Sequence, residues 1–123
     1  MKRVIILCLC TLILSGCGNT VPEQVNSKKI DCTEKNELMN DGAILIDVRT
    51  VAEYNEGHLD KSINLTVDTL STTVEALVKD KNTKIIVYCR SGNRSATAAN
   101  TLINLGYKNV YDMGSITTCY GEE

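Results

Sequence analysis

Residues 84–95 read Lys-Ile-Ile-Val-Tyr-Cys-Arg-Ser-Gly-Asn-Arg-Ser, and this stretch decides the fold. The continuous apolar run at residues 85–88 predicts a strand that is buried on both faces. The strand ends on Cys89, and a short polar loop leads into a helix that begins near Arg94. This order of elements places the Cys89 thiol above a ring of backbone N–H groups, an arrangement that holds an anion.

The loop after Cys89 favours a reactive thiolate. Residues 91–93 are Ser, Gly and Asn, which tolerate the tight and left-handed conformations that turn several amides toward one point. The N-terminus of the following helix adds positive potential, and such termini lower cysteine pKa values. Arg90 and Arg94 add charge that attracts an anionic substrate. A cysteine at the end of a buried strand is otherwise most often an inert core residue, but this loop indicates a nucleophile.

Strand and helix patterns alternate along the rest of the chain. Residues 43–48 form a second continuous apolar run, and shorter extended segments are expected at residues 62–65 and 109–112. This alternation implies an α/β fold, a parallel sheet of about five strands with helices on both faces. Ligands of such sheets bind at the carboxyl ends of the strands, where Cys89 lies.

The helices are expected between these strands. Thr33 is expected to cap a helix over residues 33–40, and a helical turn is expected at residues 51–55. Apolar residues recur at helical spacing over residues 67–79. A last helix is expected to begin near Arg94, with small residues that let it lie close to the sheet.

The N-terminus has the pattern of an export signal. Met1-Lys2-Arg3 is basic, residues 4–14 are apolar apart from one threonine, and Ser15-Gly16-Cys17 follows. The apolar run is too short for a permanent membrane span and suits a secretory signal. The residues before Cys17 resemble a bacterial lipoprotein signal, in which this cysteine becomes the lipidated first residue. An ordinary cleaved signal peptide and an uncleaved anchor are the alternatives, and all three export the domain.

The lipoprotein interpretation divides the chain into three parts. Residues 1–16 are the signal peptide, residues 17–29 are the lipidated cysteine and a flexible tether, and residues 30–123 are the folded domain. The protein is then a cell-membrane lipoprotein that faces the extracytoplasmic side. The full chain has a net charge of −2, which becomes −4 without Lys2 and Arg3. This mildly acidic balance gives no indication of nucleic-acid binding, so attachment to the membrane rests on lipid.

The sequence of residues 89–95 resembles the active-site loop of single-domain rhodaneses, a family of sulfurtransferases. The resemblance extends to residues 45–49 (Leu-Ile-Asp-Val-Arg) and 53–59 (Glu-Tyr-Asn-Glu-Gly-His-Leu), which lead into residues 62–65. It covers about residues 30–113 and implies a rhodanese-like fold. Several separated motifs in the family's order make this a specific resemblance.

The resemblance implies a double displacement in which Cys89 carries the sulfur. A small anionic donor such as thiosulfate transfers sulfur to the thiolate, and cyanide or a thiol accepts it, without metal or organic cofactor. Asp47, Arg49 and His58 are expected to have supporting, structural roles, and Glu53 is expected to pair with an arginine. A single histidine and the lack of a Cys-x-x-Cys pair argue against a zinc site. The implied substrate-binding residues are Arg90, Ser91, Gly92, Asn93, Arg94 and Ser95.

Two rival functions remain open. The loop is one residue shorter between Cys89 and Arg94 than the corresponding loop of dual-specificity phosphatases, so it suits sulfur better than phosphate. A phosphatase or arsenate reductase is therefore the less favoured enzyme. A sulfur-carrier or binding module with the same fold is the alternative outside enzymes.

Three of the six cysteines remain as thiols if the leader is removed and Cys17 is acylated. An odd number of thiols leaves at least one without an internal partner, which is unusual in a compartment that is often oxidising. Cys32 and Cys119 either form a disulfide and leave Cys89 reactive, or all three are separate thiols. In many rhodaneses a tryptophan follows the last strand, whereas this chain has Cys119 after that strand and no tryptophan. A third interpretation makes Cys119 a resolving thiol for Cys89.

Overall fold

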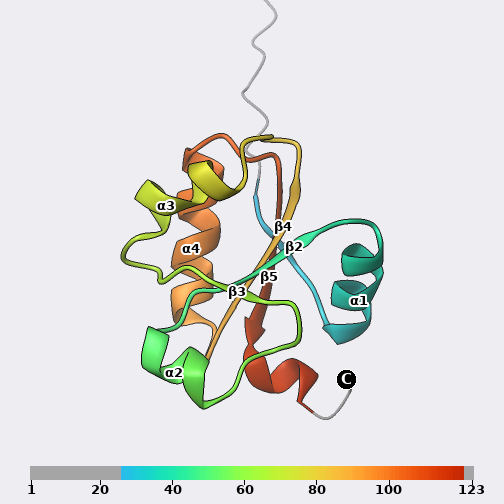
Figure 1. The fold of residues 1–123 in the computed structure, drawn as a ribbon. Helices are drawn as coiled ribbons and strands as arrows, with labels where there is room; N and C mark the ends of the chain where they lie inside the picture. Colours follow the sequence, from blue (N-terminus) through green and yellow to red (C-terminus); the bar gives the residue numbers. More distant parts are fainter. Residues whose placement is uncertain (1–25, 121–123) are drawn as a thin grey trace, which may run out of the picture.

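The protein folds around one parallel sheet (Figure 1), and a computed structural model describes residues 26–120. The strands follow the order β1-β5-β4-β2-β3, and every neighbouring pair is parallel. The predicted α/β fold with a five-stranded parallel sheet is therefore confirmed. The elements are β1 (Lys28–Lys29), α1 (Cys32–Asn40), β2 (Ile44–Asp47), α2 (Val51–Glu56), β3 (Ile63–Asn64), α3 (Leu70–Leu77), β4 (Lys84–Cys89), α4 (Asn93–Asn104), β5 (Asn109–Ser115) and the 3₁₀ helix η1 (Ile116–Cys119).

Strand β4 lies in the middle of the sheet and contributes to two apolar cores. Ile85, Val87 and Cys89 belong to the core that α3 and α4 cover, whereas Ile86 and Tyr88 belong to the core beneath α1 and η1. Figure 1 shows α3 and α4 on one side of the sheet and α1 on the other. Because successive side chains of a strand point to opposite faces, a strand covered on both sides must be apolar at every position. This burial on both faces explains the continuous apolar run at residues 85–88.

Two helix boundaries differ from the expectation. Helix α1 begins at Cys32, and its cap is Asp31 rather than Thr33, because the Asp31 carboxylate accepts a 2.8 Å hydrogen bond from the Glu34 amide. Helix α3 begins only at Leu70. The residues before it bind the sheet instead, since the Val67 amide donates to the Val48 carbonyl at 3.0 Å.

The side of the sheet that β1 and β5 form is also longer than expected. Lys28 and Lys29, which were predicted to belong to the tether, form β1 beside β5, and the Ile30 amide continues the ladder to the Asp112 carbonyl at 3.1 Å. Strand β5 continues past residue 112 to Ser115 through an irregularity opposite Val87 and Tyr88. The sheet thus includes two residues that precede the domain boundary predicted at residue 30.

The predicted leader, Cys17 and most of the tether lie outside the described residues. Within residues 26–120, the helices are too short and too polar to cross a membrane.

Cys32 and Cys119 form a disulfide with a Cα–Cα distance of 5.2 Å. The bond connects the start of α1 to the end of η1 across a sequence separation of 87 residues. Within the described part of the chain, Cys89 is the free cysteine. Of the three arrangements that the sequence left open, the structure contains the one in which Cys119 is bonded to Cys32.

Candidate active site

The candidate nucleophile lies where β4 ends and α4 begins. Cys89 is the last residue of β4, and α4 starts four residues later at Asn93. Gly92 caps the helix with φ of +98°, a left-handed conformation that glycine adopts without strain. This conformation directs the Gly92 amide toward the sulfur, and its nitrogen lies 3.0 Å from Cys89 Sγ. The sequence prediction of a thiol held by loop amides is consistent with this geometry.

Hydrogen bonds make the Cys89 thiol more acidic than usual. Burial by itself raises the pKa of this thiol, because Cys89 has no solvent-exposed surface. The amide and hydroxyl of Ser95 and the amides of Gly92 and Ser91 lower the pKa by more, so the net pKa lies below its ordinary value. The donors belong to the loop and the first turn of α4, where the helix leaves amides without intrahelical partners. The arrangement therefore favours a thiolate.

The two arginines of the loop have different surroundings. Arg94 binds Glu53 through two hydrogen bonds of 2.6 and 2.9 Å, which confirms the expectation that Glu53 pairs with an arginine. The Arg90 guanidinium has no hydrogen bond or ion pair to another described residue, whereas its backbone carbonyl accepts from Ser115 Oγ at 2.6 Å. Arg90 is thus the loop arginine whose charge is available to a ligand.

A cleft of about 390 Å³ lies next to this loop. Arg49 and residues of α2 and its following turn form one side, and residues from η1 to Tyr120 form the other. Arg90 contributes from the loop itself. The complete lining is Arg49, Glu53, Glu56, Gly57, Arg90, Ile116, Thr117 and Tyr120.

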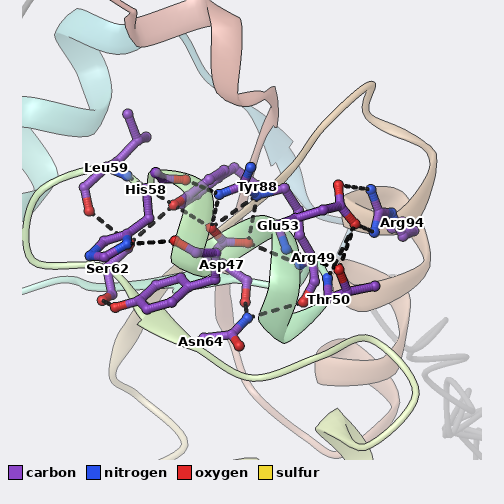
Figure 2. Close-up of polar contacts among 12 residues, drawn as sticks. Asp47, Arg49, Thr50, Glu53, His58, Leu59, Ser62, Asn64, Tyr88 and Arg94 are labelled. Atoms are coloured by element: carbon purple, nitrogen blue, oxygen red, sulfur yellow. Dashed lines mark hydrogen bonds and ion pairs between the residues drawn. The ribbon is translucent and has the colours of Figure 1, made fainter.

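Asp47 is the centre of a buried polar network beside the cysteine loop (Figure 2). Its carboxylate accepts from the amide of Arg49 at 2.9 Å and from the Arg49 guanidinium at 2.7–3.0 Å. The guanidinium also donates to the Gly57 carbonyl at 2.6 Å. The Tyr88 hydroxyl donates to the same carboxylate at 2.7 Å. The supporting roles predicted for Asp47 and Arg49 are consistent with these contacts.

Three side chains of this network, those of Tyr88, Ser62 and Asn64, were not predicted from the sequence. Burial raises the pKa of Tyr88, and its oxygen accepts from the Leu59 amide at 3.1 Å and lies 3.0 Å from Ser62 Oγ. Asn64 donates to the backbone carbonyls of Asp47 and Arg49, both at 3.0 Å. The available signal was the hydroxyl of Tyr88 in an otherwise apolar strand, because a buried tyrosine hydroxyl requires a partner.

The contacts of His58 are consistent with the structural role expected of it. Its Nδ1 lies 2.9 Å from the Tyr54 carbonyl, and its ring stacks on the Tyr54 ring with centroids 3.7 Å apart. His58 does not line the cleft. Among residues 26–120, no three His, Cys, Asp or Glu side chains are grouped so that they could hold a metal ion.

Comparison with known proteins identifies the family of this fold and loop. The rhodanese-like domain family model matches residues 31–117. The thiosulfate sulfurtransferase PspE of Escherichia coli is 32% identical over 71 residues, which cover 58% of this chain and 68% of that protein. A solved structure described as a rhodanese with anions from E. coli is 30% identical, with a TM-score of 0.61, and the match covers 63% of this chain and 91% of that one. The human single-domain sulfurtransferase TSTD1 has the same fold, with a TM-score of 0.69 at 21% identity over 80% of this chain and 99% of that one.

Other curated relatives are much longer than this chain. The tRNA uridine(34) hydroxylase of Sodalis glossinidius is 40% identical over 83 residues, which cover 63% of this chain and 24% of that protein. The chain spans about a quarter of the length of this hydroxylase and of the corresponding enzyme of Erwinia tasmaniensis.

The lowered pKa of Cys89 predicts alkylation at unusually low pH. In the full chain, the rate of iodoacetamide addition to the Cys89 peptide should rise with a midpoint below the ordinary thiol value of 9.0. Ser95→Ala removes one of the donors to the thiolate and should shift this midpoint upward. Peptide mass spectrometry over a pH series measures both. A wild-type midpoint at or above 9.0 would contradict the assignment.

The Glu53–Arg94 pair predicts a pH dependence of stability. Arg94 lowers the pKa of Glu53 to about 2 from an ordinary value of 4.5. Because the folded-state pKa is the lower one, the pair stabilises the fold above the ordinary value, and this contribution is lost as the pH falls from about 5 toward about 2. The free energy of unfolding of Glu53→Gln should therefore fall less over this range than that of the wild type.

Arg94→Gln is the matched variant, because it removes the other partner. It should reduce the same pH dependence, as measured by urea unfolding at each pH. The interpretation is wrong if both variants keep the slope of the wild type.

Proposed function

We propose that this chain, which belongs to the rhodanese-like domain family, is a sulfurtransferase that carries sulfane sulfur on Cys89. The donor is a small anion such as thiosulfate, and the acceptor is a thiol or, in the assay, cyanide. The observation that carries the proposal is the 3.0 Å contact between the Gly92 amide and Cys89 Sγ, together with the lowered pKa of the thiol. The same amides that stabilise a thiolate can stabilise a persulfide anion.

The reaction consists of two displacements at sulfur. In the first, the Cys89 thiolate attacks the outer sulfur of thiosulfate, the S–S bond of the donor breaks, and sulfite leaves with the electron pair. In the second, the acceptor attacks the outer sulfur of the persulfide, and Cys89 leaves as a thiolate. Cyanide is thereby converted to thiocyanate, and a thiolate is converted to a persulfide. Both steps conserve charge and require no oxidant.

Arg90 is the residue proposed to meet the donor. Its guanidinium has no partner among the described residues, lines the cleft and follows the nucleophile directly in the chain. Arg94 has a different role, because its charge is already balanced by the Glu53 carboxylate. It fixes the first turn of α4 against α2 and so positions the loop amides.

The rival functions differ from this proposal at defined points. A phosphatase or arsenate reductase would use the same thiolate on a larger tetrahedral oxyanion, which suits a longer loop. A sulfur carrier would form the persulfide but pass it on only to a docked partner protein. The sulfurtransferase is favoured over the carrier because an open cleft adjoins the loop, so a small acceptor has a place to bind.

We also propose that the domain is exported and anchored to the cell membrane through lipid on Cys17. The support is the order of features in residues 1–17, which are a basic start, an apolar run and a final Leu-Ser-Gly-Cys. The folded domain has no apolar span of its own among the described residues, so the lipid would supply the attachment.

The proposed function predicts sulfur uptake at one residue. When the full chain is incubated with thiosulfate, the Cys89 peptide should gain the mass of one sulfur atom, and cyanide should then release thiocyanate. Cys89→Ser should lose both reactions, because a serine hydroxyl is not ionised at neutral pH and forms no persulfide.

Three other results would point elsewhere. If Cys89 gains no sulfur and Cys89→Ser loses nothing, the sulfurtransferase proposal is wrong. Sulfur uptake without release to cyanide or to small thiols would favour the carrier. Hydrolysis of an aryl phosphate with comparable kcat/KM would favour the phosphatase.

The proposed anchor predicts that Cys17→Ser loses lipid. In a bacterial host, the wild type should sediment with membranes and carry an acylated N-terminal cysteine by mass spectrometry, whereas Cys17→Ser should not be acylated. Cys10→Ser, which changes a cysteine inside the leader, is the matched control and should remain acylated. An unmodified N-terminus in the wild type would refute the anchor.

A further inference from the structure

The disulfide connects one side of the cleft to the start of α1, which the sheet anchors. On one side, Cys32 lies just after Ile30, whose amide donates to Asp112 in β5 at 3.1 Å. Its position is therefore fixed by the sheet through β1 and β5. On the other side, Cys119 lies between two residues of the cleft, Thr117 and Tyr120. The bond thus joins a rigid part of the fold to one side of the cleft.

The residues around Cys119 form the side of the cleft opposite α2. We refer to residues 116–120 as the C-terminal wall, because Ile116, Thr117 and Tyr120 line the cleft. Ile116 and Cys119 are buried in the core beneath η1, at 2% and 1% exposure, whereas Tyr120 is 60% exposed. The wall therefore has a buried side that packs in the core and an exposed side at the cleft.

Hydrogen bonds hold only the beginning of the C-terminal wall. Ser115 Oγ donates to the Arg90 carbonyl at 2.6 Å, and it accepts from the Thr117 amide at 3.2 Å. Beyond Thr117, the backbone makes a local hydrogen bond, from the Tyr120 amide to the Thr117 carbonyl at 3.4 Å. Among the described residues, the disulfide is thus the covalent link that ties the far end of the wall to another element, and Cys119 Sγ also lies 3.5 Å from Met113 Sδ in β5.

We propose that the Cys32–Cys119 disulfide is a positioning element for the substrate cleft. It holds the C-terminal wall at the distance from Arg90 and Arg49 that a small anionic donor requires. Without the bond, the apolar packing of Ile116 keeps the domain folded, but residues 117–120 gain freedom and the cleft widens. The bond acts on binding and leaves the chemistry of Cys89 unchanged. This inference rests on the proposed sulfurtransferase activity.

The proposal separates KM from kcat. In the full chain, replacing both cysteines (Cys32→Ala with Cys119→Ala) should raise the KM for thiosulfate by about threefold or more while kcat stays within about twofold of the wild type. At saturating thiosulfate, Cys89 should still take up one sulfur atom. Thiocyanate formation at fixed cyanide, well below the melting temperature of each protein, gives both constants.

A matched variant distinguishes positioning from general destabilisation. Val74→Ala removes two methyl groups from a fully buried side chain of α3. This side chain lies in the core on the face of the sheet opposite the disulfide. It should lower the melting temperature without changing the KM for thiosulfate. Equal increases of KM in Val74→Ala and in the double variant would show a nonspecific effect and would overturn the proposal.

Reduction of the wild type provides a second route to the same state. Protein treated with dithiothreitol and desalted without air should show the same increase of KM, and reoxidation should reverse it. An unchanged KM in both the double variant and the reduced protein contradicts the proposal. Complete unfolding on loss of the bond also contradicts it, because the bond would then act on the whole fold. If the oxidised wild type itself forms no persulfide, the proposed function fails instead.

Discussion

The buried carboxylate of Asp47 is the group on which the arrangement of the site depends. It has no exposed surface, and a buried charge is costly unless ion pairs and hydrogen bonds compensate it. The compensation comes from the Arg49 guanidinium and the Tyr88 hydroxyl. Arg49 in turn holds the Gly57 carbonyl at the end of α2. One carboxylate thereby fixes the end of β2, the α2 turn and the residue that precedes Cys89.

Two of the three arginines near the thiol are paired with carboxylates, and the third is available to a ligand. Asp47 balances Arg49 and Glu53 balances Arg94, which leaves Arg90 without a partner among the described residues. The largest contributions that lower the pKa of Cys89 come from amides and the Ser95 hydroxyl, and Arg94 adds an electrostatic attraction to the thiolate. Under the proposed function, the largest stabilisation of the thiolate and the attraction of the donor are therefore supplied by different groups. An arginine substitution can then change binding without removing the nucleophile.

Local patterns predicted the parts of the structure that depend on local physics. The continuous apolar run of β4 and the Ser-Gly-Asn loop indicated the candidate nucleophile and its position in the fold, because both follow from strand periodicity and turn chemistry. The partners of Tyr88 were not predictable, since Leu59 and Asp47 are separated from it by 29 and 41 residues and meet it only through the order of the strands. Strand β1 was missed for the same reason. It consists of two lysines with no apolar signal, and its partner β5 lies near the other end of the sequence.

The disulfide also limits what a persulfide on Cys89 can do. A second thiol within reach would attack the persulfide, form an internal disulfide and release the sulfur as hydrosulfide. Cys119 is unavailable for this reaction because it is bonded to Cys32, and Cys89 is the free cysteine of the described residues. Under the proposed function, the sulfur must then leave to an acceptor that enters from outside. The same bond thus removes an internal competitor and holds one side of the cleft through which the acceptor enters, which suits a transferase better than a self-resolving redox relay.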